Sequence, residues 1–168
     1  LRSNTTGQNN TAVGNSALYY STGNNNTAVG SYTGDAITTG DNNTFVGQAA
    51  GGAVTTSSQN VAVGANALDA LTTGGQSVAI GYAALTNNTG GGNTAVGHDA
   101  MVASTTGTNN VAVGRSSLRS NTGGIDNIAI GYQALYSSSN YNYQIAIGRN
   151  ALYSHDSSSI GNVAIGYD

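Results

Sequence analysis

Cysteine, proline, tryptophan, glutamate and lysine are all absent from this 168-residue chain, and charge of either sign is scarce. Without cysteine the chain has no disulfides, no thiolate metal ligands and no cysteine nucleophile. Four scattered arginines and a net charge of −3 do not suit a nucleic-acid-binding protein, which needs clustered cations to neutralise phosphates. No apolar run approaches the ~18 residues of a membrane span. We therefore expect neither nucleic acid nor membrane contact for this segment.

Glycine, serine, threonine and asparagine dominate the composition, and a regular period organises them. In an aperiodic chain this composition would indicate disorder. Here a Val-Gly or Ile-Gly pair recurs ten times, at intervals of 16 to 18 residues. The pairs are Val13 and Gly14, Val29 and Gly30, Val46 and Gly47, Val63 and Gly64, Ile80 and Gly81, Val96 and Gly97, Val113 and Gly114, Ile130 and Gly131, Ile147 and Gly148, and Ile165 and Gly166. Such a period predicts structural repeats that stack on one another.

Most repeats read Asn, a β-branched residue, Ala, Val or Ile, Gly, two variable residues, Ala and Leu, followed by a polar loop. The β-branched, Ala, Val/Ile triplet predicts a short strand, because branched side chains fit a pleated surface and alternate between its faces. The glycine supplies a tight corner or a positive φ. The asparagine can stack as an amide ladder on the next rung. We therefore predict an all-β parallel β-solenoid of about ten rungs of 17 residues each, with its loops in solvent.

Both faces of the predicted strand carry apolar or small side chains. This indicates that both faces pack against other parts of the protein, as in buried parallel sheets. A second short strand around Ala17 and Leu18 can cover one face, and a neighbouring chain is the simplest cover for the other. We expect partner chains to seal the alanine side of the strand. The candidate interface residues are Ala12, Ala28, Ala62, Ala79, Ala95, Ala112, Ala129, Ala146 and Ala164.

The two ends of the sequence both fall within the repeat pattern. Residues Leu1 to Thr5 are identical to residues Leu118 to Thr122, so the chain begins inside a rung. Neither end carries the polar cap that protects the open edge of a solenoid. We expect residues 1–168 to form one repeat array without caps, a segment of a longer fibre.

The repeat resembles the head repeats of trimeric autotransporter adhesins, in residues Val78–Ala84 (VAIGYAA) and Ile128–Leu135 (IAIGYQAL). Residues Ile130–Ser137 and Ile147–Ser154 are similar to arrays found in phage-type tail-fibre proteins and bacterial surface-fibre proteins. The resemblance implies a left-handed parallel β-roll that forms a homotrimer about a central axis. It also implies an extracellular fibre, on a cell surface or a virion, that binds a host surface, matrix or glycan. The rungs here are longer than the usual adhesin repeat. The binding specificity that the adhesin loops provide can therefore not be assigned to the loops of this chain.

Catalytic and metal-binding patterns are weak throughout the sequence. The two histidines, His98 and His155, occupy different repeat positions, whereas a metal or catalytic pair must converge. The sequence contains no calcium-binding Gly-Gly-x-Gly-x-Asp repeat, nucleophile elbow or phosphate-binding loop. We therefore predict no catalytic residue, no metal and no cofactor, and interpret the protein as a non-enzyme.

Tyrosine and asparagine are the residues with a candidate binding role. The ten tyrosines follow the corner glycine or begin loops. Their rings can stack on sugars or partners, or they can shield the flank of the solenoid; both interpretations stay open. Asn-x-Thr acceptors for N-linked glycans occur at Asn4, Asn9, Asn25, Asn42 and Asn87.

The favoured function is that of a structural segment of an extracellular fibre, of the surface-adhesin or tail-fibre type, that mediates attachment. The alternative is a purely structural filament, glycosylated on its Asn- and Thr-rich loops, that has no receptor. An ice-binding solenoid is less favoured, because ice binding needs threonines in flat ranks and these lie in Gly-flanked loops of uneven length.

Overall fold

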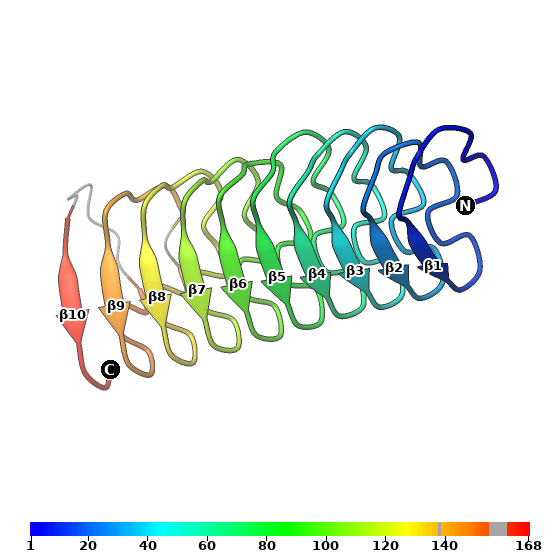
Figure 1. Ribbon diagram of the computed structural model, residues 1–168. Coiled ribbons are helices and arrows are strands. Elements are labelled where there is room, and N and C mark those ends of the chain that lie inside the picture. The colour runs from blue at the N-terminus through cyan, green and yellow to red at the C-terminus, as the bar shows by residue number, and fades with distance from the viewer. Residues whose placement is uncertain (138, 155–160) are drawn as a thin grey trace.

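A computed structural model describes residues 1–137, 139–154 and 161–168 of the chain. The chain winds into a rod whose ten short strands lie side by side in one parallel sheet (Figure 1). The strands are β1 (Thr11–Val13), β2 (Thr27–Val29), β3 (Thr44–Val46), β4 (Val61–Val63), β5 (Val78–Ile80), β6 (Thr94–Val96), β7 (Val111–Val113), β8 (Ile128–Ile130), β9 (Ile145–Ile147) and β10 (Val163–Ile165). The predicted all-β parallel β-solenoid is confirmed. Over the described ranges, no helix is long and apolar enough to cross a membrane.

Neighbouring strands pair in register, residue for residue. In β1 and β2, Ala12 stands beside Ala28 and Val13 beside Val29. The ladder continues past the strands, where the N–H of Gly30 donates to the carbonyl of Val13 at 2.8 Å. All strand pairs share this register, because differences in repeat length fall in the loops. Each column of the sequence repeat therefore becomes a row along the rod.

The strand alanines point into the rod, and the residues on either side of them point outward. In β2 and β5 a buried alanine lies between a half-buried and an exposed residue. The prediction that these alanines contact partner chains is wrong, because most of them are fully buried in the core of their own chain and those of the end strands pack against it. The corrected residues are Ala12, Ala28, Ala62, Ala79, Ala95, Ala112, Ala129, Ala146 and Ala164.

The wall opposite the strands consists of turns, so the predicted second strand around Ala17 and Leu18 is wrong. Ser16 and Leu18 both have positive φ, 57° and 47°, and Ala17 and Leu18 are buried in the core. The left-handed conformation costs a non-glycine residue ~1–2 kcal/mol, whereas full burial of a leucine contributes ~1.5–3 kcal/mol. Burial therefore stabilises the turn. Buried Leu or Met with positive φ recurs at Leu68, Leu85, Met101, Leu118 and Leu135.

Strand β3 carries a large residue where the other strands carry the inward alanine. Phe45 takes that position and is fully buried. Glycine, as Gly34 and Gly51, replaces the buried leucine in the two turns next to it. A Cβ atom on Gly51 would lie 2.6 Å from Cε2 of Phe45, and one on Gly34 would lie 3.0 Å from its Cδ2. One phenylalanine therefore fills space that two leucines occupy elsewhere, which keeps the core close-packed.

A row of buried amides closes the core at the entrance to the strands. The backbone N–H and the Nδ2 of Asn43 both donate to Oδ1 of Asn26, at 2.9 and 3.1 Å. Asn60 repeats this pair of bonds to Asn43 at 3.0 Å each. Each amide thus satisfies buried polar groups of the next rung, and the predicted amide ladder is confirmed. It runs through Asn10, Asn26, Asn43, Asn60, Ser77, Asn93, Asn110, Asn127 and Gln144.

The glycine after each strand turns the chain away from the sheet. These ten glycines have φ between 128° and 141°, a region that side chains disfavour. A Cβ atom on Gly47 would also lie 2.6 Å from the carbonyl oxygen of Gly64 in the next rung. The predicted positive φ of this glycine is confirmed, and the close approach of the next rung is a second reason for glycine here.

Candidate functional site

The residues that flank each inward alanine form two parallel rows outside the sheet, which we call the outer sheet face. The first row is Thr11, Thr27, Thr44, Val61, Val78, Thr94, Val111, Ile128, Ile145 and Val163. The second row is Val13, Val29, Val46, Val63, Ile80, Val96, Val113, Ile130, Ile147 and Ile165. Neither row contains a charged residue. At the ~4.8 Å spacing of paired strands, ten strands make this face about 43 Å long.

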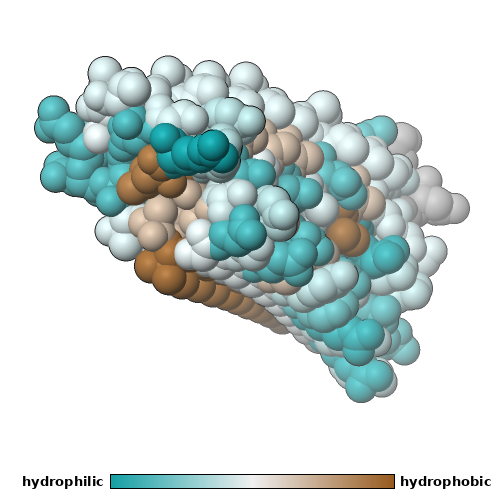
Figure 2. All heavy atoms as spheres, turned by 90° about the vertical axis from the view of Figure 1, so that its right-hand side faces the viewer, coloured by the Kyte–Doolittle hydropathy of each residue, from teal (hydrophilic) through white to brown (hydrophobic). Residues whose placement is uncertain are grey.

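The second row exposes large aliphatic side chains in consecutive rungs. Val29, Val46 and Val63 are each 37% exposed, and Ile80 is 39% exposed. Figure 2, which views the rod from its N-terminal end, shows a continuous apolar ridge that follows the rod into the distance. Soluble monomers rarely expose contiguous apolar surface on this scale, and larger patches mark interaction sites. The outer sheet face is therefore a candidate interface.

An exposed row of amides borders the outer sheet face at the entrance to the strands. Nδ2 of Asn9 donates to Oδ1 of Asn25 at 3.2 Å, and Nδ2 of Asn25 donates to Oδ1 of Asn42 at 3.3 Å. Nε2 of Gln76 donates to Oε1 of Gln59 at 3.2 Å. We call these five residues the amide row. It is a second, solvent-exposed ladder beside the buried one.

The predicted glycan acceptors divide into four exposed side chains and one half-buried side chain. Three of them, Asn9, Asn25 and Asn42, belong to the amide row and are exposed, as is Asn87. Asn4 is half-buried, since its Nδ2 donates to the carbonyl of its own turn at 3.1 Å and its Oδ1 accepts a backbone N–H at 2.8 Å. Four of the five acceptors therefore lie at the surface.

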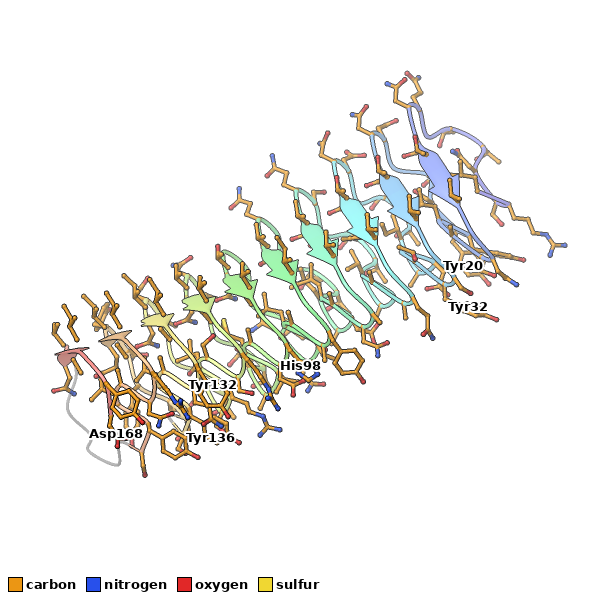
Figure 3. All side chains as sticks on the ribbon, turned by 90° about the horizontal axis from the view of Figure 1, so that it is seen from below. Tyr20, Tyr32, His98, Tyr132, Tyr136 and Asp168 are labelled. Atoms are coloured by element: carbon orange, nitrogen blue, oxygen red, sulfur yellow. The ribbon has the colours of Figure 1, made fainter. Side chains whose placement is uncertain are left out.

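A row of aromatic and cationic side chains, which we call the cation–aromatic ladder, occupies the position directly after the corner glycine. Its members are Tyr82, His98, Arg115, Tyr132, Arg149 and Tyr167, one from each of six consecutive rungs and all exposed. The rings of Tyr82 and His98 stack with centroids 5.0 Å apart. The guanidinium carbon of Arg149 lies 5.3 Å from the ring centroid of Tyr132 and 5.8 Å from that of Tyr167. His98 and Tyr132 lie along the same side of the rod (Figure 3).

A second aromatic column lies four residues further along each rung. The guanidinium carbon of Arg119 lies 5.6 Å from the ring centroid of Tyr136, which stacks on Tyr153 with centroids 5.0 Å apart. Nearer the N-terminus the same column holds Asp35 and Asp69. This column therefore carries cationic and aromatic residues toward both ends, with Arg2 and Tyr19 before the two aspartates and Arg119, Tyr136 and Tyr153 after them.

The two aspartates of this column have perturbed titration. Burial raises the pKa of Asp35 above its ordinary value, against the opposing effect of backbone N–H donors. Burial also raises the pKa of Asp69, and the negative charge of Asp35 adds to the increase, whereas N–H donors from Ala53 and Gly52 oppose it. Both carboxylates are therefore more easily protonated than in the unfolded chain.

Exposed and half-exposed threonines also form a regular row, so the expectation that uneven loops would scatter them is wrong. The row is Thr22, Thr38, Thr55, Thr72, Thr89, Thr105 and Thr122. Their hydroxyls mostly donate to the carbonyl of the next rung, as in Thr22 to Thr38 at 2.9 Å. Glycines interrupt the neighbouring column, at Gly23, Gly90 and Gly123. The other rungs carry exposed threonine in that column, at Thr39, Thr56, Thr73 and Thr106, so the threonines form a double row that the glycines interrupt.

The histidines do not assemble a metal or catalytic site in the residues described. Nδ1 of His98 lies 3.1 Å from Oδ2 of Asp99, and its ring is stacked on Tyr82. His155 lies outside the described residues. In the parts of the chain that the structure covers, no three potential metal ligands come together.

Comparison of the chain with models of protein families, with curated proteins and with solved structures gives no match. The fold defines a parallel β-solenoid, and its outstanding surfaces are the outer sheet face and the cation–aromatic ladder. The tyrosines after the corner glycine were recognised from the sequence as candidates for stacking, whereas the arginines of the same column were not. The signal was present, since Tyr, His or Arg follows the glycine in six successive repeats.

Proposed function

We propose that this chain is a structural segment of an extracellular fibre, of the surface-adhesin or tail-fibre type, that mediates attachment. In this proposal three copies, each wound left-handed, run parallel about a common axis and cover one another's outer sheet face. The segment has no catalytic role and uses no cofactor. The observation that carries the proposal is the pair of uncharged rows, rich in Val and Ile, on the outside of the coil.

The exposed part of the second row contributes free energy that offsets much of the cost of association. Full burial of a Val or Ile side chain contributes ~1.5–3 kcal/mol. Side chains that are about 40% exposed retain roughly 0.6–1.2 kcal/mol of that gain for a partner. Along the seven most exposed members of the row, the total is on the order of 4–8 kcal/mol per chain, within the ~4–15 kcal/mol that association costs. The first row and the flanking columns add to this amount.

A second copy of the chain is the occupant that fits this face best. The face carries no charge to direct a partner of opposite sign, and it is apolar in rung after rung. A parallel copy has the same rung spacing and matches it along the whole length. The resemblance to adhesin head repeats supports three copies. The revised interface therefore uses the Val and Ile rows in place of the alanines.

Attachment is assigned to the sides of the rod that face away from the outer sheet face. These sides carry the turns, the Thr-rich loops and the aromatic columns, and the cation–aromatic ladder extends over six consecutive rungs. A host surface, a matrix component or a glycan is the proposed class of ligand. The proposed location is a cell surface or a virion fibre.

Light scattering on the purified segment tests the assembly. We expect a mass three times the 16.7 kDa of one chain for the wild type, and single-chain mass for Ile80→Asp, which places a charge in the interface. Thr72→Asp is the matched control, because Thr72 is exposed in a loop. We expect this variant to have the mass of the trimer. A folded monomer of the wild type at micromolar concentration would contradict the proposal.

A purely structural, glycosylated filament is the second candidate, and the exposed acceptors of the amide row favour it. Asn9, Asn25 and Asn42 stand in one row on consecutive rungs. Intact-mass measurement on material from the natural source decides between the two. Sugar masses at these asparagines, with no binding on a glycan array, would support the filament alone.

A further inference from the structure

We infer that the cation–aromatic ladder is a binding strip for an extended acidic polysaccharide in which acidic and neutral sugars alternate. The inference deepens the proposed function, since it names a ligand class for the attachment surface. Its first support is location. His98 and Tyr132 lie on the side of the rod that faces the viewer in Figure 3, while the strands run along the upper margin. A trimer that covers the outer sheet face leaves this side accessible.

The stacking in the ladder determines which atoms face a ligand. Neighbouring members lie above one another along the rod, so that the guanidinium of Arg149 has an aromatic ring on each side. Stacked faces are unavailable to a sugar ring. What remains is the outer edge, which presents phenolic hydroxyls and the N–H donors of guanidinium groups. An edge of this kind binds by hydrogen bonds and charge, so it favours anionic and hydroxylated ligands.

The arginines of the ladder retain donors for an external anion. In the part of the chain that the structure covers, the single contact between a carboxylate and a basic side chain joins Asp99 to His98. Arg115 and Arg149 therefore have aromatic partners but no carboxylate partner among the described residues. Arg119, in the neighbouring column, adds a third guanidinium to the same stretch of the rod. Guanidinium groups bind carboxylate and sulfate groups with bidentate geometry.

The order of residues in the ladder sets the repeat of the ligand. Arg115 and Arg149 stand two rungs apart, with Tyr132 between them. At ~4.8 Å per rung the two guanidinium groups lie about 10 Å apart along the rod. A polymer with an acidic sugar in every second position places its charges at the arginines and its neutral sugar at the tyrosine hydroxyl. Nucleic acid fits less well, since its dense phosphates would meet few cations on a chain of net charge −3.

Isothermal titration calorimetry with oligosaccharides of alternating glucuronate and N-acetylglucosamine tests the inference. We expect the wild type to bind them, and the carboxyl-reduced, neutral form of the same oligosaccharide to bind at least about tenfold more weakly, because it loses charge-assisted hydrogen bonds. The double variant Arg115→Gln, Arg149→Gln should also weaken binding by about tenfold or more. Arg149→Lys should fall between, since it keeps the charge but loses the planar fork.

Arg2→Gln is the matched control, because Arg2 also lies over a tyrosine, with its guanidinium carbon 5.7 Å from the ring centroid of Tyr19, but outside the ladder. We expect its affinity to stay within about twofold of the wild type. Equal binding of the neutral oligosaccharide, stronger binding of double-stranded DNA, or unchanged affinity in the double variant would each overturn the inference. Light scattering on the same samples separates the two proposals. A trimer without oligosaccharide binding refutes the strip alone, whereas a monomer that binds refutes the assembly alone.

Discussion

The two faces of the same sheet are filled in opposite ways. Toward the inside of the coil nine strands present alanine, and toward the outside they present valine, isoleucine or threonine. A globular domain places its larger apolar side chains inside. Here the large buried side chains come mostly from the turns of the opposite wall, and these share one core with the strand alanines. The larger apolar residues of the strands therefore mostly point outward, where a partner chain can cover them.

The inner face should be the more sensitive of the two, and Phe45 gives the largest effect. Phe45→Ala leaves a cavity beside Gly34 and Gly51, with an expected loss of ~3–5 kcal/mol in the free energy of unfolding. Urea denaturation at fixed protein concentration measures it. Adding Gly51→Leu should restore much of the loss, because φ at Gly51 is 62° and the equivalent Leu68 has φ 56°. No improvement in the double variant would contradict the account of the core.

The buried amide ladder should give the next largest effect. Asn60→Ala removes the Oδ1 that accepts the backbone N–H of Ser77 at 3.0 Å, and it leaves that donor buried without its partner. We expect a loss of ~1–3 kcal/mol in the free energy of unfolding, measured by urea denaturation. Asn60→Ser is the matched control with a smaller expected loss, because Ser77 already continues the ladder in the next rung. Equal losses in both variants would argue against the amide as the cause.

On the outer face, a mild substitution should affect assembly more than folding. Ile80→Thr introduces a residue that the first row already uses and removes apolar surface from the second. We expect the proposed trimer to dissociate more readily than that of the wild type, by roughly 0.6–1.2 kcal/mol for each chain, in sedimentation equilibrium. Folding of the separated chain should change by less than about 0.5 kcal/mol, the range for surface substitutions. If Ile80→Thr changed the free energy of unfolding more than the free energy of association, the outer face would not be the interface proposed here.

The two aspartates Asp35 and Asp69 should give the smallest effect, through pH. Because burial raises the pKa of Asp69 in the folded chain, the folded state binds more protons than the unfolded state between the unfolded and the folded pKa values. Stability contributed by this group therefore falls as pH rises through that window. Asp69→Asn should raise the melting temperature slightly at neutral pH and flatten its decrease between acid and neutral pH. An unchanged pH profile would contradict the assignment.

Periodicity accounts for the parts of the fold that the sequence predicts well. The columns that hold Gly47 and Asn43 repeat so regularly that their corner and ladder roles follow from stacking alone. Alternation in a strand separates Ala79 from Val78 and Ile80, but it does not say which set points inward, since all three are apolar. The space inside the coil decides which residues point inward, and this space depends on the side chains of the opposite wall. Nor does composition reveal that Leu18 adopts positive φ, a conformation that leucine rarely takes.

The surface was predicted less completely than the core. The tyrosines were recognised as candidates for stacking, but their partners Arg115 and Arg149 come from other rungs, about 17 residues away in sequence. Their contact depends on the register between rungs. Once the register is known, the residue after each corner glycine defines the ladder directly.

Cysteine cross-linking tests the assignment of the two faces most directly, because the chain has no cysteine of its own. Ile80→Cys places a thiol on the outer sheet face, and Ala79→Cys places one in the core of the same strand. With mild oxidant, we expect Ile80→Cys to form covalent pairs of chains on a non-reducing gel, while Ala79→Cys stays single. Covalent pairs from Ala79→Cys, or none from Ile80→Cys, would contradict an interface built on the valine and isoleucine rows.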